Sequence, residues 1–259
     1  MCGITGYVGV KSASEVVLQG LHTLEYRGYD SAGVAAFVNG KIGVVKAVGK
    51  VANVEEKIAS LGTLNGATCG IGHTRWATHG APSDTNSHPH GTDKIQIVHN
   101  GIIENYAPLR EMLKENGFTF VSETDTEVAA KLIEYHYNKC GDREDALVNA
   151  MHDIVGSYAI AAMFLDCPET IYAIRKDNPL IIGVGEGENF VASDIAAVLR
   201  YTKTYYQLGD RELAVVTKSS VVIKDINKNA VEHPLLTATW SIEAAERGGY
   251  DHFMIKEIN

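Results

Sequence analysis

The spacing of apolar and polar residues predicts alternating helices and strands at the start of the chain. An apolar, glycine-containing run predicts a strand over 2–10. Apolar residues three and four positions apart then predict a helix over 12–28, with Gly28 at its end. The stretches 33–39 and 41–48 predict two strands joined by an Asn-Gly pair, which is typical of a tight hairpin.

The rest of the chain has a helical middle part and a strand-rich C-terminal part. Further helices are expected at 53–61, 105–117, 124–139 and 145–155, and further strands at 69–75, 95–101, 157–165, 170–175, 180–185, 189–193, 212–217 and 221–226. Thr124 and Glu127 have capping-box spacing, and Asn105 and Gly117 are the expected ends of another helix. Because helices and strands do not alternate as βαβ units, the order favours a mixed α+β domain with antiparallel sheets.

One domain over 1–259 accounts for this pattern, because the sequence has no internal repeat and no low-complexity linker. The 45% hydrophobic content of the chain is enough for a core of that size. The last residues, 252–259, resemble a helix without a stop signal. We therefore expect that the chain is a fragment of a longer protein.

Charge and cysteine usage narrow the class. The net charge of −9 argues against nucleic-acid binding, which needs a basic surface. No signal-peptide pattern and no apolar run of membrane-spanning length occurs, so the sequence predicts no membrane association. The four cysteines, Cys2, Cys69, Cys140 and Cys167, are far apart and form no CxxC pair. This pattern is typical of a reduced, cytoplasmic protein.

Cys2, directly after the initiator methionine, is the first candidate for chemistry. If Met1 is removed, the α-amine of the cysteine has a pKa of about 8 and can accept the proton of its own thiol. Nucleophile and base then belong to one residue. The alternative is an ordinary thiol at the chain terminus.

The expected loop at 75–94 is long for a compact domain, and long ordered loops tend to be functional. Histidines are concentrated in and around it: His73, His79, His88, His90 and His99. Their spacing matches no common metal-binding pattern, and no HExxH or CxxC pair accompanies them. We therefore expect no metal and interpret these histidines as hydrogen-bonding residues that order the loop.

Other stretches each have a chemical and a structural interpretation. Asn100 and Gly101 after an apolar strand offer two donors for an oxyanion hole, or a simple turn. The stretch RWATHG at 75–80 offers a guanidinium for a carboxylate, or a surface loop. Asp125 offers a carboxylate for an ammonium group, or a helix-start residue. The glycines of 183–187 lack a full phosphate-binding pattern and indicate a hairpin turn.

Taken together, these motifs resemble one family. MCGITGYVG, LEYRGYDSAG, HTRWATHG, NSHPH, VHNGIIEN, SETDTEV and GENFVASD occur in this order and through most of the chain. They are similar to the N-terminal glutaminase domain of glutamine–fructose-6-phosphate aminotransferases, within the class II, or N-terminal-nucleophile, glutamine amidotransferases. The resemblance implies a four-layer αββα sandwich of two antiparallel sheets between helices. It also implies a glutaminase that needs no cofactor.

The resemblance assigns a role to each residue of the site. Cys2 is the implied nucleophile, Asn100 and the Gly101 N–H form the oxyanion hole, and Arg27 orders the region around Cys2. Arg75 binds the glutamine α-carboxylate with support from Thr78 and His79, Asp125 binds the α-ammonium group, and Trp76 lies on the mobile loop near the ammonia exit. The implied glutamine-binding residues are therefore Arg75, Trp76, Thr78, His79, Gly101 and Asp125.

The resemblance also implies partners. In the family, the glutaminase domain supplies ammonia to C-terminal sugar-phosphate isomerase domains, which convert fructose 6-phosphate to glucosamine 6-phosphate and form a homodimer. Two alternatives stay open at this stage. The first alternative is the glutaminase half of another class II enzyme, such as an amidophosphoribosyltransferase. The second is a non-catalytic module that keeps the fold. The intact set of Cys2, Arg75, Asn100 and Asp125 argues against the second alternative.

Overall fold

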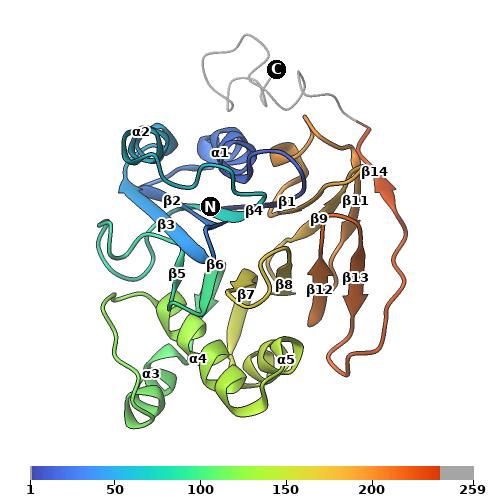
Figure 1. The fold of residues 1–259 in the computed structure, drawn as a ribbon. Helices are drawn as coiled ribbons and strands as arrows, with labels where there is room; N and C mark the ends of the chain where they lie inside the picture. The colour runs from blue at the N-terminus through green and yellow to red at the C-terminus, as the bar shows by residue number, and fades with distance from the viewer. Residues whose placement is uncertain (1, 240–259) are drawn as a thin grey trace, which may run out of the picture.

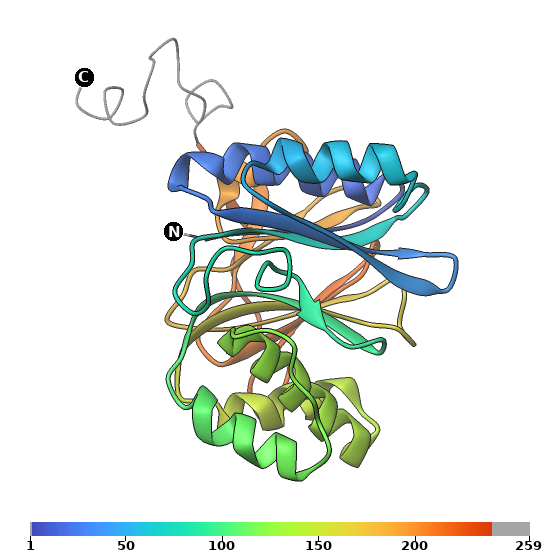
Figure 2. The ribbon, with the colours of Figure 1, turned by 90° about the vertical axis from the view of Figure 1, so that its left-hand side faces the viewer.

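Two antiparallel sheets face each other between two layers of helices in the computed structural model, which describes residues 2–239 without the side chain of Arg27 (Figures 1 and 2). The first sheet has the order β14-β11-β9-β10-β1-β4-β2-β3. Its strands are β1 (Gly3–Val8), β2 (Ser31–Val38), β3 (Lys41–Val48), β4 (Cys69–Arg75), β9 (Ile181–Val184), β10 (Asn189–Ala192), β11 (Thr204–Gln207) and β14 (Leu236–Thr237).

The second sheet has the order β13-β12-β8-β7-β6-β5. Its strands are β5 (His90–Gly91), β6 (Ile95–Ile103), β7 (Gly156–Phe164), β8 (Ile171–Lys176), β12 (Glu212–Val216) and β13 (Val221–Lys224). Helices α1 (Ala13–Leu24) and α2 (Val51–Leu61) cover the first sheet, and α3 (Tyr106–Glu115), α4 (Asp125–Cys140) and α5 (Arg143–Asp153) cover the second (Figure 2). The expected αββα sandwich is therefore confirmed.

The core consists of three apolar layers. One lies between the two sheets, and each of the other two lies between a sheet and the helices that cover it. Strand β1 shows how the sequence produces this arrangement. Its side chains alternate, so Ile4 and Val8 enter the layer between the sheets while Tyr7 enters the layer under α1. Because both faces are covered, every residue of β1 is buried. Burial of each such large side chain stabilises the fold by about 1.5–3 kcal/mol.

Local signals placed most elements correctly. The hairpin turn between β2 and β3 has Asn39 at φ 51° and Gly40 at φ 74°, the left-handed pair that the Asn-Gly sequence predicts. The Thr124 side chain accepts a hydrogen bond from the Glu127 backbone N–H, so it caps α4 as expected. The reciprocal hydrogen bond of a capping box, from the Thr124 backbone N–H to the Glu127 side chain, does not form. The Glu127 carboxylate instead accepts bonds from the backbone of residues 121–122 and pairs with Lys131.

Three expectations about element ends and strands need correction. Helix α1 ends at Leu24, and a 3-10 turn (Glu25–Arg27) continues to Gly28, which has φ 99°. Asn105 precedes α3, but its side chain bonds to the backbone of residues 153 and 155 rather than capping the helix. The pattern missed the short strands β5, β11 and β14.

Two further observations concern the ends and the hydropathy of the chain. The helix-like stretch expected at 252–259 lies outside the described residues. Within residues 2–239, none of the helices has the length and apolar character that crossing a membrane requires.

Candidate active site

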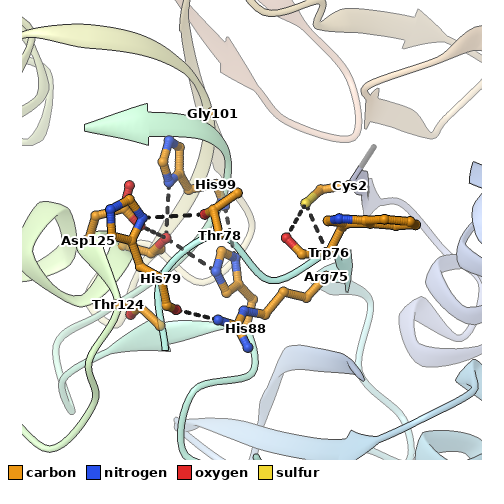
Figure 3. Close-up of a pocket in the computed structure, with 11 residues that line it drawn as sticks. Cys2, Arg75, Trp76, Thr78, His79, His88, His99, Gly101, Thr124 and Asp125 are labelled. Carbon is orange, nitrogen blue, oxygen red and sulfur yellow. Dashed lines mark hydrogen bonds between the residues drawn. The ribbon is translucent and has the colours of Figure 1, made fainter. Parts of the chain in front are cut away.

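One pocket lies where the start of β1 meets the end of β4, the end of β6 and the start of α4. It is lined by Cys2, Arg75, Trp76, Thr78, His79, His88, His99, Gly101, Thr124, Asp125 and Thr126 (Figure 3). Sheet register explains this convergence. Antiparallel pairing of Gly3 with Thr74 puts the residue before β1 beside the last residue of β4. Figure 3 shows Cys2 and Trp76 on one side of the pocket and Asp125 on the other.

The Cys2 thiol is held by backbone groups. The Trp76 N–H donates to Sγ at 3.1 Å, and Sγ lies 3.6 Å from the Trp76 carbonyl oxygen, to which the thiol donates. Burial raises the pKa of this thiol, and the Trp76 N–H opposes the shift only in part. The resting group is therefore the thiol, and a nearby base is needed to make it a nucleophile.

Strand β1 itself is anchored by the GENFVASD stretch. The Ser193 hydroxyl accepts a hydrogen bond from the Ile4 N–H at 3.0 Å, and β10 pairs with β1 from Thr5 to Val8. This stretch therefore fixes the strand that carries Cys2 without entering the pocket.

Asn100 contacts Cys2 from β6, although its side chain is not part of the pocket lining. Its Nδ2 donates to the Cys2 carbonyl oxygen at 3.2 Å, and its Oδ1 lies 2.9 Å from Nε2 of His73. An amide nitrogen carries two hydrogens, so one remains after the bond to Cys2. The adjacent Gly101 has φ 128°, and a Cβ there would lie 2.1 Å from the Ser157 carbonyl oxygen. Only glycine fits this position.

Arg75 is almost completely buried at the end of β4, yet its guanidinium is only partly used. Its Nη2 donates to the carbonyl oxygens of His79 and Gly80, the latter at 2.8 Å. Its Nη1 lies 3.6 Å from the Asp30 carboxylate and makes no hydrogen bond. One edge of a buried guanidinium is thus available to a ligand carboxylate.

The loop after Arg75 is fixed by short-range contacts. The Asp30 carboxylate accepts a bond from the Ala77 N–H, and the Trp76 ring packs so closely on Gly28 that a Cβ would lie 2.1 Å from it. Nδ1 of His79 lies 3.4 Å from the Thr78 hydroxyl. Trp76 remains 55% exposed, so it covers the pocket from the solvent side.

Asp125 is buried at the first position of α4, where the helix dipole favours a negative charge. Its Oδ2 accepts from the Ile103 N–H at 2.9 Å, and Oδ1 lies 3.5 Å from the Thr126 hydroxyl. Among the side chains that the structure describes, no basic group lies within ion-pair distance of Asp125. A buried carboxylate without a cationic partner is a suitable site for an ammonium group.

Four of the histidines, His73, His88, His90 and His99, are buried in or beside the pocket wall. Nδ1 of His88 accepts from the His99 N–H at 3.4 Å, and His90 lies 3.3 Å from the Asn86 carbonyl oxygen. Burial lowers the pKa of His73 and His90 to about 3 and lowers the pKa of His88 well below its usual value. Within residues 2–239, no group of three or more His, Cys, Asp or Glu side chains is placed to hold a metal ion.

The structure brings the sequence-predicted residues together with one exception. Arg27 lies in the 3-10 turn after α1, and its side chain is outside the described part of the molecule. Two further residues belong here: Asp30, to which sequence analysis gave no role, and His73, which it interpreted only as one of the histidines that order the loop. Asp30 holds the Ala77 backbone and faces Arg75, and His73 contacts Asn100. The DSAG and HTR stretches contain them, but only the strand register shows what they contact.

Comparison with known proteins identifies the family. The model for the glutamine amidotransferase domain matches residues 73–200, which contain most of the pocket-lining residues. Glutamine–fructose-6-phosphate aminotransferase [isomerizing] of Caldanaerobacter subterraneus is 53% identical over the whole chain. This chain belongs to the class II glutamine amidotransferases. The protein with that name from Pyrococcus horikoshii is 51% identical over the whole chain.

The amidotransferase chain spans only 42–43% of the length of these two relatives. Among solved structures, glutamine phosphoribosylpyrophosphate amidotransferase from B. subtilis superposes with a TM-score of 0.73 and 26% identity, over 88% of this chain and 50% of that one. A class II glutamine aminotransferase domain protein from Silicibacter pomeroyi has a TM-score of 0.59 and 15% identity, covering 87% of this chain and 99% of its own, and it shows the shared fold alone.

Proposed function

We propose that this amidotransferase domain hydrolyses L-glutamine to glutamate and ammonia through a thioester on Cys2. The observation that carries the proposal is that four different groups lie together, three of them in the pocket lining and the fourth, from Asn100, in contact with Cys2. A thiol, a carboxamide donor, a partly unpaired guanidinium and an unpaired carboxylate come from Cys2, Asn100, Arg75 and Asp125. Together they can bind the α-carboxylate and α-ammonium groups of an amino acid and attack an amide on its side chain.

Substrate binding follows from charge. The α-carboxylate of glutamine binds the free edge of Arg75, and its α-ammonium group binds Asp125. Both protein groups are buried, so water screens these contacts weakly. Thr78 and His79 support the Arg75 side of the pocket, and Trp76 closes it toward the solvent. The side-chain amide of the substrate is thereby directed toward Cys2.

The first chemical step forms the thioester. Removal of Met1 frees the α-amine of Cys2, which takes the thiol proton, and the thiolate then attacks the carboxamide carbon. The second hydrogen of Asn100 Nδ2 and the Gly101 N–H stabilise the oxyanion of the tetrahedral intermediate. The protonated α-amine returns its proton to the leaving nitrogen, and ammonia departs. Arg27 orders the chain around Cys2 during this step.

The second step releases glutamate. Water attacks the thioester carbon while the α-amine accepts a proton from it, and the same oxyanion donors act again. The thiolate leaves and is reprotonated, which restores the starting enzyme. Each step is acyl transfer performed by groups of the chain itself.

In the longer protein, we propose that the ammonia serves the conversion of fructose 6-phosphate to glucosamine 6-phosphate by C-terminal isomerase domains. The name of the Caldanaerobacter relative, glutamine–fructose-6-phosphate aminotransferase [isomerizing], and its 53% identity support this acceptor. The alternative acceptor system, that of an amidophosphoribosyltransferase, has weaker support at 26% identity. Residues 1–259 then form one domain of a cytoplasmic homodimer that has no nucleic-acid or membrane partner.

The direct test is glutamate release from glutamine by the purified 259-residue chain. We expect equal amounts of glutamate and ammonia, with no glucosamine 6-phosphate by mass spectrometry when fructose 6-phosphate is added. Absence of glutamate release from folded protein with a verified Cys2 N-terminus contradicts the glutaminase proposal. Formation of glucosamine 6-phosphate contradicts the proposal that the sugar conversion belongs to the C-terminal isomerase domains.

A further inference from the structure

His73 makes one hydrogen-bonding contact that the reaction described above does not use. It lies on β4, it is fully buried, and its Nε2 is 2.9 Å from the side-chain oxygen of Asn100. Its other ring nitrogen, Nδ1, is also buried and makes no hydrogen bond of good geometry, although the His99 backbone lies close to the ring. The one well-formed hydrogen bond of the imidazole is therefore to the residue proposed to stabilise the oxyanion.

The direction of this hydrogen bond follows from the groups around it. The Cys2 carbonyl oxygen, 3.2 Å from the Asn100 side chain, can only accept, so the amide atom facing Cys2 is Nδ2. Oδ1 must then face His73, and because Oδ1 also only accepts, Nε2 of His73 must carry the hydrogen. Complete burial keeps the ring neutral, so Nδ1 carries no hydrogen.

We infer that His73 is a positioning residue that holds the Asn100 carboxamide with its NH₂ group toward the reacting carbonyl. The inference rests on the proposed glutaminase function. An amide rotated by half a turn would present Oδ1 to the developing oxyanion, which would repel it rather than stabilise it. The bond from His73 and the bond to Cys2 both oppose that rotation, so Asn100 enters the reaction already oriented.

The His73 ring is itself held in place. It stacks on His88 with 4.1 Å between ring centroids and 17° between ring planes. His88 is fixed at both nitrogens, because Nδ1 accepts from the His99 N–H and Nε2 lies 3.2 Å from the Thr126 hydroxyl. Rotation of His73 away from Asn100 would therefore disturb a packed pair of rings.

The experiment compares His73→Leu with His73→Gln. Leucine removes the donor, whereas the glutamine side-chain nitrogen can replace Nε2. We expect His73→Leu to lower kcat about 10- to 100-fold with KM within about twofold, because orientation acts on the transition state. His73→Gln should restore kcat to within about threefold of the wild type. In an Asn100→Ala background, His73→Leu should have no further effect on kcat.

A control separates positioning from general loss of stability. Asn189→Ala removes a buried hydrogen bond to the Thr217 carbonyl oxygen, at the end of β10 that pairs with Val8, away from Cys2. It should lower the melting temperature and leave kcat unchanged. Equal kcat losses in His73→Leu and His73→Gln, or a further loss in the double variant, would overturn the inference.

Nitrogen-15 NMR of histidine-labelled protein decides the geometry independently of activity. We expect the His73 signals, identified by their loss in His73→Gln, to show a neutral ring protonated at Nε2 from pH 5 to 8. A ring protonated at Nδ1, or one that titrates in this range, contradicts the inference. An inactive wild type that shows the Nε2–H ring would contradict the glutaminase proposal and leave the hydrogen-bond assignment in place.

Discussion

Two pockets of this domain each contain an arginine near a histidine, but the buried Arg75 and the partly buried Arg175 differ in how their charges are neutralised. The second pocket is lined by Arg175, Gln207, Leu208, Gly209, His233, Pro234 and Leu236. There, Arg175 donates to Leu208 and pairs with Asp210 at 2.5 Å, and His233 lies 2.9 Å from Glu212. Nε of Arg175 has no partner, yet the charge of the group is matched by Asp210.

In the pocket beside Cys2, the charges are matched less completely. Arg175 is hydrogen-bonded to Asp210, whereas Arg75 Nη1 lies 3.6 Å from the Asp30 carboxylate and makes no hydrogen bond. Asp125 bonds to an N–H and a hydroxyl rather than to a cation. Buried charges with incomplete hydrogen bonding are costly to the fold, so their presence is consistent with a ligand that completes them. The comparison teaches that an arginine in a cavity marks a binding site only when its neighbours leave it incomplete.

The largest expected effect comes from the thiol. Cys2→Ala should lower turnover by about 10⁴-fold or more, because no other group in the pocket can form the thioester. Glutamine binding, measured by calorimetry, should change little. Cys167→Ala is the matched control and should keep full activity, since Cys167 bonds to Thr170 far from the pocket. Residual turnover in Cys2→Ala close to that of the wild type would contradict the assignment.

Loss of the oxyanion donor should have the next largest effect. Asn100→Ala should lower kcat about 10²- to 10³-fold, the usual effect of removing one such donor, with a smaller change in KM. Steady-state kinetics of glutamate release measures both quantities. A change confined to KM would assign Asn100 to substrate binding instead.

The comparison of the two pockets is tested most directly by its two arginines. Arg75→Ala should raise KM for glutamine about 100-fold, because a buried, charge-assisted contact to the carboxylate is lost. Arg175→Ala should change KM by less than about twofold while lowering the melting temperature. If the two variants behaved alike in KM, the distinction between the hydrogen-bonded Arg175 and the incompletely bonded Arg75 would be wrong.

The smallest effect concerns stability at low pH. Burial holds the pKa of His73 and His90 at about 3, below the value of about 6.5 in the unfolded chain. Between these values the unfolded state binds more protons, so the free energy of unfolding is highest above pH 6.5 and decreases as the pH falls toward 3. Each histidine contributes a slope of about 1.4 kcal/mol per pH unit.

Urea unfolding of the wild type and His90→Gln at several pH values from 7.5 to 4.5 measures this slope. The variant should lose the contribution of one histidine, so its stability should decrease less steeply with falling pH, even if it is less stable at pH 7.5. Identical slopes would mean that His90 is not a neutral buried ring in the folded state.

The sequence predicted the elements whose signals are local. The Asn39-Gly40 turn and the Thr124 cap depend on neighbouring residues, so the chain encodes them within a few positions. Strands β11 and β14 are different. They are short, and they are strands because they pair with β9 and with each other. Segments of four and two residues are too short for an alternation of apolar and polar residues to indicate such pairing.

The site shows the same division. Motif resemblance identified the groups around the pocket, such as Arg75 and Asp125, because their residue types and order are characteristic. It assigned no role to Asp30 or His73, since their effects depend on partners 47 and 27 positions away. Contacts at such separations are set by sheet register, which the residue pattern alone does not reveal.

The central claim is that Cys2, with a free α-amine, is the nucleophile. The measurement is intact-mass and peptide mass spectrometry after treatment with a glutamine analogue that carries an electrophilic ketone. It compares chains starting at Cys2 with chains carrying an uncleavable N-terminal extension, whose amide nitrogen is not basic. We expect one adduct, on Cys2, and glutamate release only when the α-amine is free. Labelling of Cys69, Cys140 or Cys167 instead, or full activity of the extended chain, would contradict the account.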